Sequence, residues 1–175
     1  MASAGRGPIY LGQRLGQVVE DSRVFRAIAY NKSAVVVHML RRLMGDEAFM
    51  RGVRRFYTTW RFRKAGTDDF RAAFEAEAGM SLDRFIRGWV MEASLPVVGV
   101  IARTEDGGAT AVVRIEQSGP VFVFPYTVTL QYQDGSSEAV TIPVSTAVAE
   151  RRVPLAGPLR RIETRDELTL ALVAR

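Results

Sequence analysis

The chain has 175 residues, of which 47% are hydrophobic and 25% charged, and this size and composition fit one ordinary globular domain or two small ones. It contains no cysteine, which excludes disulfides, thiolate catalysis and cysteine-ligated zinc. The net charge of +5 arises in the first half: residues 1–95 carry 16 Lys and Arg against 10 Asp and Glu, whereas residues 96–175 carry 8 against 9.

The beginning of the chain carries no recognisable targeting signal. Residues 1–8 are small and rich in glycine, without the apolar region of a signal peptide, and are typical of a flexible start. Elsewhere no apolar run approaches the roughly 20 residues that a membrane-spanning helix needs. We therefore expect neither a leader nor a membrane span in this chain, and its compartment stays open.

Apolar residues recur at helical spacing between residues 34 and 60. Gly45 divides this region, because a glycine here is typical of a left-handed helix end. Asp46 and Glu47 then favour the start of a second helix, where acidic side chains meet the positive end of the helix dipole. The stripes that we predict to face a core are Val35, Val36, Met39, Leu40, Leu43 and Met44, followed by Phe49, Val53, Phe56, Tyr57 and Trp60.

Two further helices are predicted before residue 90. Thr67 is typical of a helix N-cap, and Gly79 is typical of the end of the same helix. Ser81 is the predicted cap of the next helix. Because the connections are short, neighbouring helices are expected to run antiparallel. The predicted inward-facing residues are Phe70 and Phe74 in the third helix and Leu82, Phe85, Ile86 and Trp89 in the fourth.

The sequence changes character at Pro96, after which β-branched and polar residues alternate. Asp106-Gly107-Gly108 and Asp134-Gly135 are typical of hairpin turns. The pattern predicts an α+β protein of two subdomains, with an antiparallel helical unit over residues 1–95 and a seven-stranded antiparallel β-sandwich over residues 96–175. The predicted strands are 97–104, 109–117, 121–132, 137–144, 147–154, 159–164 and 168–174.

The residues that could carry catalysis are few. His38 is the only histidine, and it lies in an apolar helix pattern, so we interpret it as a structural residue with satisfied hydrogen bonds rather than a metal ligand. With no cysteine and one such histidine, neither an HExxH motif nor a Ser-His-Asp triad is available. The acidic pairs Asp46-Glu47 and Asp68-Asp69 fit first-turn positions of helices better than acid–base catalysis.

Two other features are interpreted without a catalytic role at this point. A cluster of basic residues lies between residues 51 and 64, but acidic residues are interleaved close by and no nucleic-acid motif accompanies it. We interpret this cluster as a solvated helix face and expect no nucleic-acid partner. The alternative is nucleic-acid binding through the cluster, which predicts a steep dependence of binding on salt. From composition alone, Tyr30 is an aromatic anchor at the start of the first helix.

A series of short motifs nevertheless resembles a known family, and their order and spacing are more specific than any one of them. The motifs are Tyr30-Asn31-Lys32-Ser33, Met39-Leu40-Arg41, Gly45-Asp46-Glu47-Ala48-Phe49, Arg54-Arg55-Phe56-Tyr57, Thr67-Asp68-Asp69-Phe70 and Phe85-Ile86-Arg87-Gly88-Trp89. With them, residues 7–89 resemble the gluzincin-clan zinc aminopeptidases, of the alanyl-aminopeptidase type. Residues from Pro96 onward are more weakly similar to the small β-sandwich domain that follows the catalytic domain in that family.

The resemblance implies a role for Tyr30 and a location for the metal. By motif position Tyr30 matches the family's catalytic tyrosine, which donates a hydrogen bond to the oxyanion of the tetrahedral intermediate. Ser33 stands where the family usually has glycine. The family's zinc ligands, HExxH and a further glutamate, lie upstream of this tyrosine in a thermolysin-like domain, and none is present here. The resemblance thus implies a zinc enzyme in the intact protein and no cofactor in this chain.

Two functions from different classes follow from these observations. The first is the C-terminal fragment of a zinc aminopeptidase, inactive alone, whose partner is the missing N-terminal catalytic half and whose substrate is a peptide in the intact enzyme. It predicts an exposed apolar surface on the helical unit, through which the chain could also form a homo-oligomer. The alternative is a non-catalytic protein-binding module with an Ig-like sandwich, which leaves the ordered peptidase motifs unexplained.

Overall fold

A computed structural model of the chain describes residues 8–10 and 22–173, so the predicted flexible start up to residue 7 and the end of the last predicted strand lie outside the described residues. The chain divides into two compact units, Met1–Ser94 and Leu95–Arg175. The helical unit contains α1 (Ser22–Arg26), the π-helical turn η3 (Ala27–Lys32), α2 (Ser33–Met44), α3 (Asp46–Trp60), α4 (Thr67–Ala78), α5 (Asp83–Ile86) and the π-helical turn η4 (Arg87–Met91).

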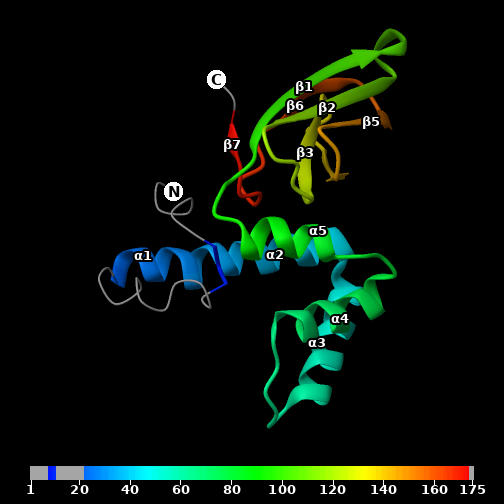
Figure 1. Cartoon of the computed structure of the whole chain (residues 1–175). Coiled ribbons are helices and arrows are strands. Elements are labelled where there is room, and N and C mark those ends of the chain that lie inside the picture. The colour runs from blue at the N-terminus through cyan, green and yellow to red at the C-terminus, as the bar shows by residue number, and fades with distance from the viewer. Residues whose placement is uncertain (1–7, 11–21, 174–175) are drawn as a thin grey trace. The chain divides into compact units, whose positions relative to one another are not determined.

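The helices α1, η3 and α2 form one continuous rod, visible in Figure 1. Gly45 ends it at φ 81°, a conformation that a residue with a Cβ rarely adopts. Arg41 then reaches across this turn and donates two hydrogen bonds, of 2.8 and 2.6 Å, to the carboxylate of Asp46 at the start of α3. The predicted boundary between the first two helices is therefore confirmed.

An aromatic cluster holds α3 and α4 together. The rings of Phe70 and Phe74 on α4 have centroids 4.2 Å apart, and they contact Phe56 and Phe49 of α3 at 5.4 Å each. Gly52 allows this approach, because a Cβ built there would lie 2.8 Å from the ring of Phe74. The core of the helical unit therefore depends on close contact between these two helices.

The structure differs from the predicted caps and stripes at four residues. One is Ser81, because the N-cap of α5 is Leu82. Helix α4 begins with Thr67 itself, and the preceding Gly66 is the N-cap, whose N–H donates to the carboxylate of Asp69 at 2.8 Å. The expected cap at Thr67 is therefore wrong by one residue. Val53 and Tyr57 were predicted to face the core, but their exposed fractions are 37% and 65%. The apolar stripe of α3 is thus wider than the surface that α4 covers.

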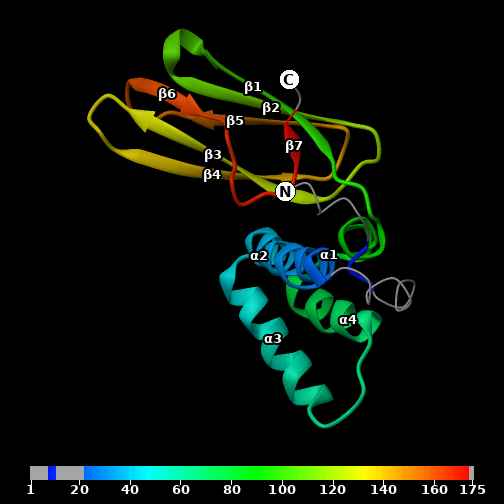
Figure 2. The ribbon, with the colours of Figure 1, turned by 90° about the vertical axis from the view of Figure 1, so that its left-hand side faces the viewer.

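The second unit consists of two sheets, seen best in Figure 2. One has the strand order β5-β2-β1-β7 and the other β4-β3-β6. All pairs run antiparallel except β1 with β7, which is parallel and only two residues long, so an entirely antiparallel seven-stranded arrangement is not what the structure has. The strands are β1 (Val97–Glu105), β2 (Thr110–Ser118), β3 (Phe124–Tyr132), β4 (Ser137–Val144), β5 (Val148–Pro154), β6 (Leu159–Glu163) and β7 (Leu172–Val173), with a short helix η5 (Asp106–Gly108) between β1 and β2.

Both sheets contribute to one core in the second unit. Ala111 and Val153 from the first sheet cluster with Leu130 and Tyr132 from the second. The loop between β2 and β3 is fixed by Gln117, whose buried amide donates to the carbonyls of Phe122 and Thr146 and accepts from the N–H of Phe122, each at 2.9 Å. Because buried main-chain groups are costly when unpaired, this side chain stabilises both loops that it reaches.

The two predicted hairpin turns are present. Gly107 and Gly108 have φ of 65° and 93°, and Gly135 has φ 87°. Such values favour glycine, which is why these positions could be located from the sequence. Among the described residues, no helix has the length and apolar character needed to cross a membrane.

Candidate functional site

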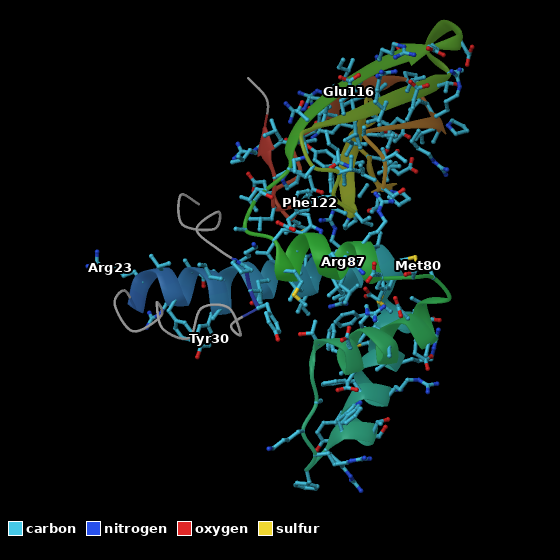
Figure 3. The ribbon with its side chains drawn as sticks, in the orientation of Figure 1. Arg23, Tyr30, Met80, Arg87, Glu116 and Phe122 are labelled. Atoms are coloured by element: carbon cyan, nitrogen blue, oxygen red, sulfur yellow. The ribbon has the colours of Figure 1, made fainter. Side chains whose placement is uncertain are left out.

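Tyr30 lies in η3, in the middle of the long helical rod, and its side chain projects away from the ribbon (Figure 3). Its ring packs edge-on against Phe25, with centroids 5.9 Å apart and planes at 83°. This contact orients the ring but leaves 64% of the side chain exposed. The phenol is therefore held on a regular element while remaining available to a group outside this unit.

The turn that carries Tyr30 is anchored on its other side. Ile28 and Lys32 are buried, with exposed fractions of 3% and 2%. The hydroxyl of Ser33 donates to the carbonyl of Ile28 at 3.2 Å, five residues earlier, which suits the wider π-helical turn. The ammonium of Lys32 donates to the main-chain carbonyl of Glu92 at 3.2 Å. Single π-helical turns inside α-helices occur frequently at functional sites.

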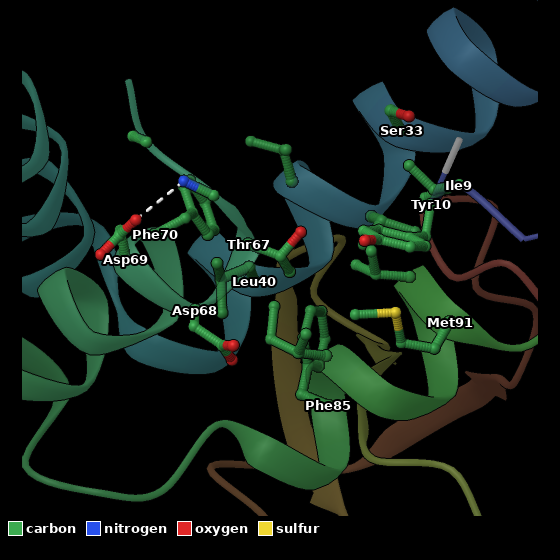
Figure 4. A pocket seen from close by; sticks show the side chains of 16 residues that line it. Ile9, Tyr10, Ser33, Leu40, Thr67, Asp68, Asp69, Phe70, Phe85 and Met91 are labelled. Atoms are coloured by element: carbon green, nitrogen blue, oxygen red, sulfur yellow. Dashed lines mark hydrogen bonds between the residues drawn. The ribbon is translucent and has the colours of Figure 1, made fainter. Parts of the chain in front are cut away.

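A cavity of about 670 Å³ opens beside this rod (Figure 4). Ser33, one turn after Tyr30, lines it together with apolar residues of α2, such as Val37. Residues from the start of α4, from α5 and from η4 also line the cavity, as does Tyr10, whose N–H donates to the carbonyl of Val90 at 2.9 Å. This lining is mostly apolar, so the cavity is suited to apolar side chains rather than to a charged ligand.

Three of the four residues in the acidic pairs, Asp46, Asp68 and Asp69, are engaged in structural contacts. Asp46 accepts hydrogen bonds from Arg41, and these bonds lower the pKa of its carboxyl. Asp69 accepts from Gly66, and Asp68 is in an ion pair with Arg71 at 3.2 Å. The interpretation of both pairs as residues of the first helical turn therefore agrees with the structure.

The residues described here do not form a metal site. Within residues 8–10 and 22–173, no three His, Asp or Glu side chains are grouped so that they could hold an ion. His38 is half-buried on α2, and its Nε2 is buried without a hydrogen-bond partner among these residues. The prediction that His38 has satisfied hydrogen bonds is thus wrong, although it is packed into the fold. A zinc ion needs three or four ligands, and this donor set does not supply them.

Part of the basic cluster is engaged in ion pairs within the helical unit. Arg51 and Arg55 on α3 both contact Glu77 of α4, at 2.9 and 2.7 Å. The hydrogen bonds from Arg55 and then Arg51 lower the pKa of Glu77 below its ordinary value. Arg63 stacks over the ring of Trp60 at 5.3 Å. These contacts connect α3 to α4 and to the turn between them.

An exposed apolar stripe runs along the other face of α3. Met50, Val53 and Tyr57 recur at spacings of three and four residues, and each exposes more than a third of its surface. Beyond the end of α3, Phe62 is fully exposed and has φ 61°, which is rare for a bulky residue. The helical period predicts that Val53 and Tyr57 face a core, but it does not reveal whether a partner helix is present, and Met50 lies outside the predicted stripe.

Comparisons with known proteins find similarity to aminopeptidases. The family model described as "Peptidase family M1 domain" matches residues 2–89. Aminopeptidase M1-A of Oryza sativa subsp. japonica is 31% identical over 61% of this chain and 12% of its own length, and the mitochondrial aminopeptidase 2 of Saccharomyces cerevisiae is 22% identical over 77% of this chain and 15% of its own length.

A solved structure is also similar in fold. Aminopeptidase A of Legionella pneumophila, crystallised in complex with aspartic acid, superposes with a TM-score of 0.68 over 80% of this chain and 16% of its own, at 20% sequence identity. At this identity the likeness concerns the fold alone. This chain spans less than a fifth of the length of each relative named here.

Proposed function

This chain belongs to peptidase family M1, whose description matches half of its residues, and we propose that it is the C-terminal fragment of a zinc-dependent aminopeptidase. In this proposal residues 1–95 are the helical end of a thermolysin-like catalytic domain. Residues 96–175 are the β-sandwich domain that follows, with the two sheets packed face to face. The intact enzyme hydrolyses peptide bonds at the N-terminus of its substrate.

The observation that supports a catalytic role is the placement of Tyr30. Its phenol is exposed, on a helix rather than a loop, and oriented by Phe25. In the intact enzyme we expect it to donate a hydrogen bond to the oxyanion that forms when water attacks the peptide carbonyl. A preorganised donor of this kind contributes about 3–4 kcal/mol to transition-state stabilisation.

The metal belongs to another part of the enzyme in this proposal. The donor set of residues 8–10 and 22–173 does not fit zinc, and in this proposal the ligands and the general base come from residues upstream of the chain. Zinc supplies Lewis acidity and an activated water in such enzymes. We therefore propose that this chain alone does not hydrolyse peptides.

The partner in this proposal is the missing N-terminal half. Two surfaces of the helical unit suit it: the apolar cavity beside α2, and the exposed stripe of α3 that ends near Phe62. Large exposed apolar patches normally mark association sites. Without the missing half, the same surfaces favour a homo-oligomer. They also favour, as a second candidate, a non-catalytic protein-binding module.

Aminopeptidase activity distinguishes the two candidates. This chain and a version extended upstream in its own reading frame are assayed with zinc and an aminoacyl substrate. Only the extended form should turn over, and Tyr30→Phe should lower its kcat by about 100- to 1000-fold. Tyr57→Phe, an exposed tyrosine on α3, is the matched control and should leave kcat unchanged. An extended frame without metal ligands or activity would favour the binding module.

A further inference from the structure

Lys32 stands out by composition and by burial. The sequence has 24 Lys and Arg residues, and Lys32 and Lys64 are the only lysines among them. Lys64 is exposed, whereas Lys32 has an exposed fraction of 2% and is one of the largest fully enclosed side chains. A buried ammonium is unfavourable unless its protons meet acceptors. A chain that otherwise uses arginine almost throughout thus places a lysine at the most enclosed basic position of its described residues.

One acceptor of Lys32 lies at the end of another helix. Its Nζ donates to the carbonyl of Glu92 at 3.2 Å, and the N–H of Glu92 bonds the carbonyl of Arg87 at 3.1 Å, closing the last turn of η4. Carbonyls at a helix C-terminus carry partial negative charge, so a cation is favourable there. Lys32 thereby links the rod that carries Tyr30 to a helix 60 residues further along the chain.

Tyr30 and Lys32 share the same π-helical turn. Ile28 and Lys32 are buried on one side of η3, and the side chain of Tyr30 projects from the other side. Any rotation or shift of this turn therefore moves the phenol. Catalytic groups have to be held within about 0.5 Å of the productive geometry, and a displacement of about 1 Å can lower a rate about 100-fold.

We infer that Lys32 is a positioning residue for Tyr30: its buried ammonium ties η3 to the end of η4 and so fixes where the phenol lies in the active site. This inference rests on the proposed function. Arginine is not equivalent here, because a planar guanidinium is larger than the single nitrogen at the end of a lysine. Methionine keeps nearly the same length and removes the charge and the hydrogen bonds.

A double-mutant cycle in the extended, active enzyme tests this inference. Lys32→Met should lower kcat by about 30-fold and change KM by less than about twofold, because the substitution displaces the phenol and leaves substrate binding intact. In the Tyr30→Phe background the same substitution should change kcat less than about twofold. Lys32→Arg should lower kcat less than Lys32→Met, and Lys64→Met should leave it unchanged. A Lys32→Met effect that is equally large without the Tyr30 hydroxyl would overturn the inference.

The same cycle separates this inference from the proposed function. If Tyr30→Phe does not lower kcat, the catalytic role of Tyr30 fails whatever Lys32 does. Should Lys32→Met not fold, Lys32→Arg provides the cycle instead. In this 175-residue chain, 3-fluorotyrosine at position 30 gives an independent readout by ¹⁹F NMR. Lys32→Met should shift or broaden its resonance and Lys64→Met should not; an unchanged resonance contradicts the coupling.

Discussion

The two units of this chain differ in how completely each encloses its own apolar residues. In the β unit, Val113, Phe124 and Leu130 have no exposed surface at all, and Gln117 satisfies the main-chain groups of the loops around them. In the helical unit, Tyr57 and Phe62 remain exposed to 65% and 101%. Among the described residues, nine large apolar side chains of the helical unit are exposed against five of the β unit, so the helical unit leaves more apolar surface uncovered.

Helix α3 shows how this difference arises. A helix that packs against a single partner needs only one apolar stripe. On α3, Phe49 and Gly52 form the stripe that faces α4, and Met50 and Val53 continue the apolar surface around the helix. The second stripe is the kind of surface that a further packing element covers. The helical unit thus has apolar surface on α3 that none of its own described helices covers.

The largest effect is expected from a substitution inside the β core. Leu130→Ala removes a fully buried side chain that clusters with Ala111 and Val153, and should lower the free energy of unfolding of this unit by about 3 kcal/mol. Urea unfolding followed by far-UV circular dichroism measures it. Leu168→Ala, at an exposed position, is the control and should change it by less than about 0.5 kcal/mol.

Tryptophan fluorescence shows whether the two units unfold independently. Both tryptophans, Trp60 and Trp89, are in the helical unit. The fluorescence transition should therefore stay where it is in Leu130→Ala while the circular dichroism transition of the β unit moves. A fluorescence transition that moves by the same amount would mean that the two units unfold as one cooperative unit.

A smaller effect is expected at the contact between α3 and α4. In a solvent-exposed helix, Gly→Ala stabilises by about 1 kcal/mol through helix propensity. At Gly52, however, the added Cβ would lie 2.8 Å from the ring of Phe74. That ring is held by Phe49 and Phe70, so we expect a net loss of about 1–2 kcal/mol, measured by tryptophan fluorescence. Gly99→Ala in β1, where a Cβ meets nothing within 4 Å, is the control. A stabilised Gly52→Ala would show that the contact is loose.

Much of the fold could be predicted from the sequence, because local signals are strong where a glycine needs a positive φ. Gly45 and Gly79 mark the ends of helices, and Gly135 marks a hairpin turn. Six of the seven predicted strands are present within a few residues of their expected bounds. The seventh, predicted over residues 168–174, is only Leu172–Val173 and pairs in parallel with β1. No local sequence pattern reveals this long-range pairing.

The candidate site could be predicted only in part. Tyr30 was identified through the order of short motifs, and its role stays a prediction. From the sequence, Lys32 is only a member of the Tyr30-Asn31-Lys32-Ser33 motif with no assigned role, although a lysine in this part of an arginine-rich chain is a signal. The exposure of Val53 and Tyr57 could not be foreseen, because helical period indicates that a face is apolar and says nothing about whether a partner is there to cover it.

The pH dependence of the helical unit should follow Glu77. Hydrogen bonds from Arg55 and then Arg51 lower its pKa in the folded protein below the ordinary 4.5. A lowered folded-state pKa means that this contribution to stability is present above the unfolded pKa and is lost as pH falls through the folded value. The helical unit should therefore lose stability below about pH 4.5, and Glu77→Gln should remove this part of the slope.

Tryptophan fluorescence during urea unfolding at several pH values measures the slope. Since these groups are at the surface, the effect should be small, and added salt should reduce it further. Glu47→Gln, an exposed carboxylate that forms no ion pair in the described part of the chain, is the control and should leave the slope unchanged. A slope that persists in Glu77→Gln would place the titrating group elsewhere.

The smallest effect on stability, and the most direct test of the comparison, is expected at the exposed stripe. Tyr57→Ser and Phe62→Ser remove side chains that no other described element covers, so the free energy of unfolding should change by less than about 0.5 kcal/mol. Sedimentation velocity over a concentration series should nevertheless show weaker self-association than in the unmodified chain. Val121→Ser, an exposed apolar residue of the β unit, is the control and should leave association unchanged.

The opposite pattern would be equally informative. If Tyr57→Ser lowers stability by more than about 1 kcal/mol, this side chain is packed in solution and the helical unit closes its own core. If neither association nor stability changes, the stripe is exposed but does not mediate self-association. The cavity beside α2 is then the next surface to test, with Val37→Ser. Weaker association at constant stability means that the exposed stripe of α3 mediates self-association. In the extended form the upstream residues should cover this stripe, and that form should be monomeric.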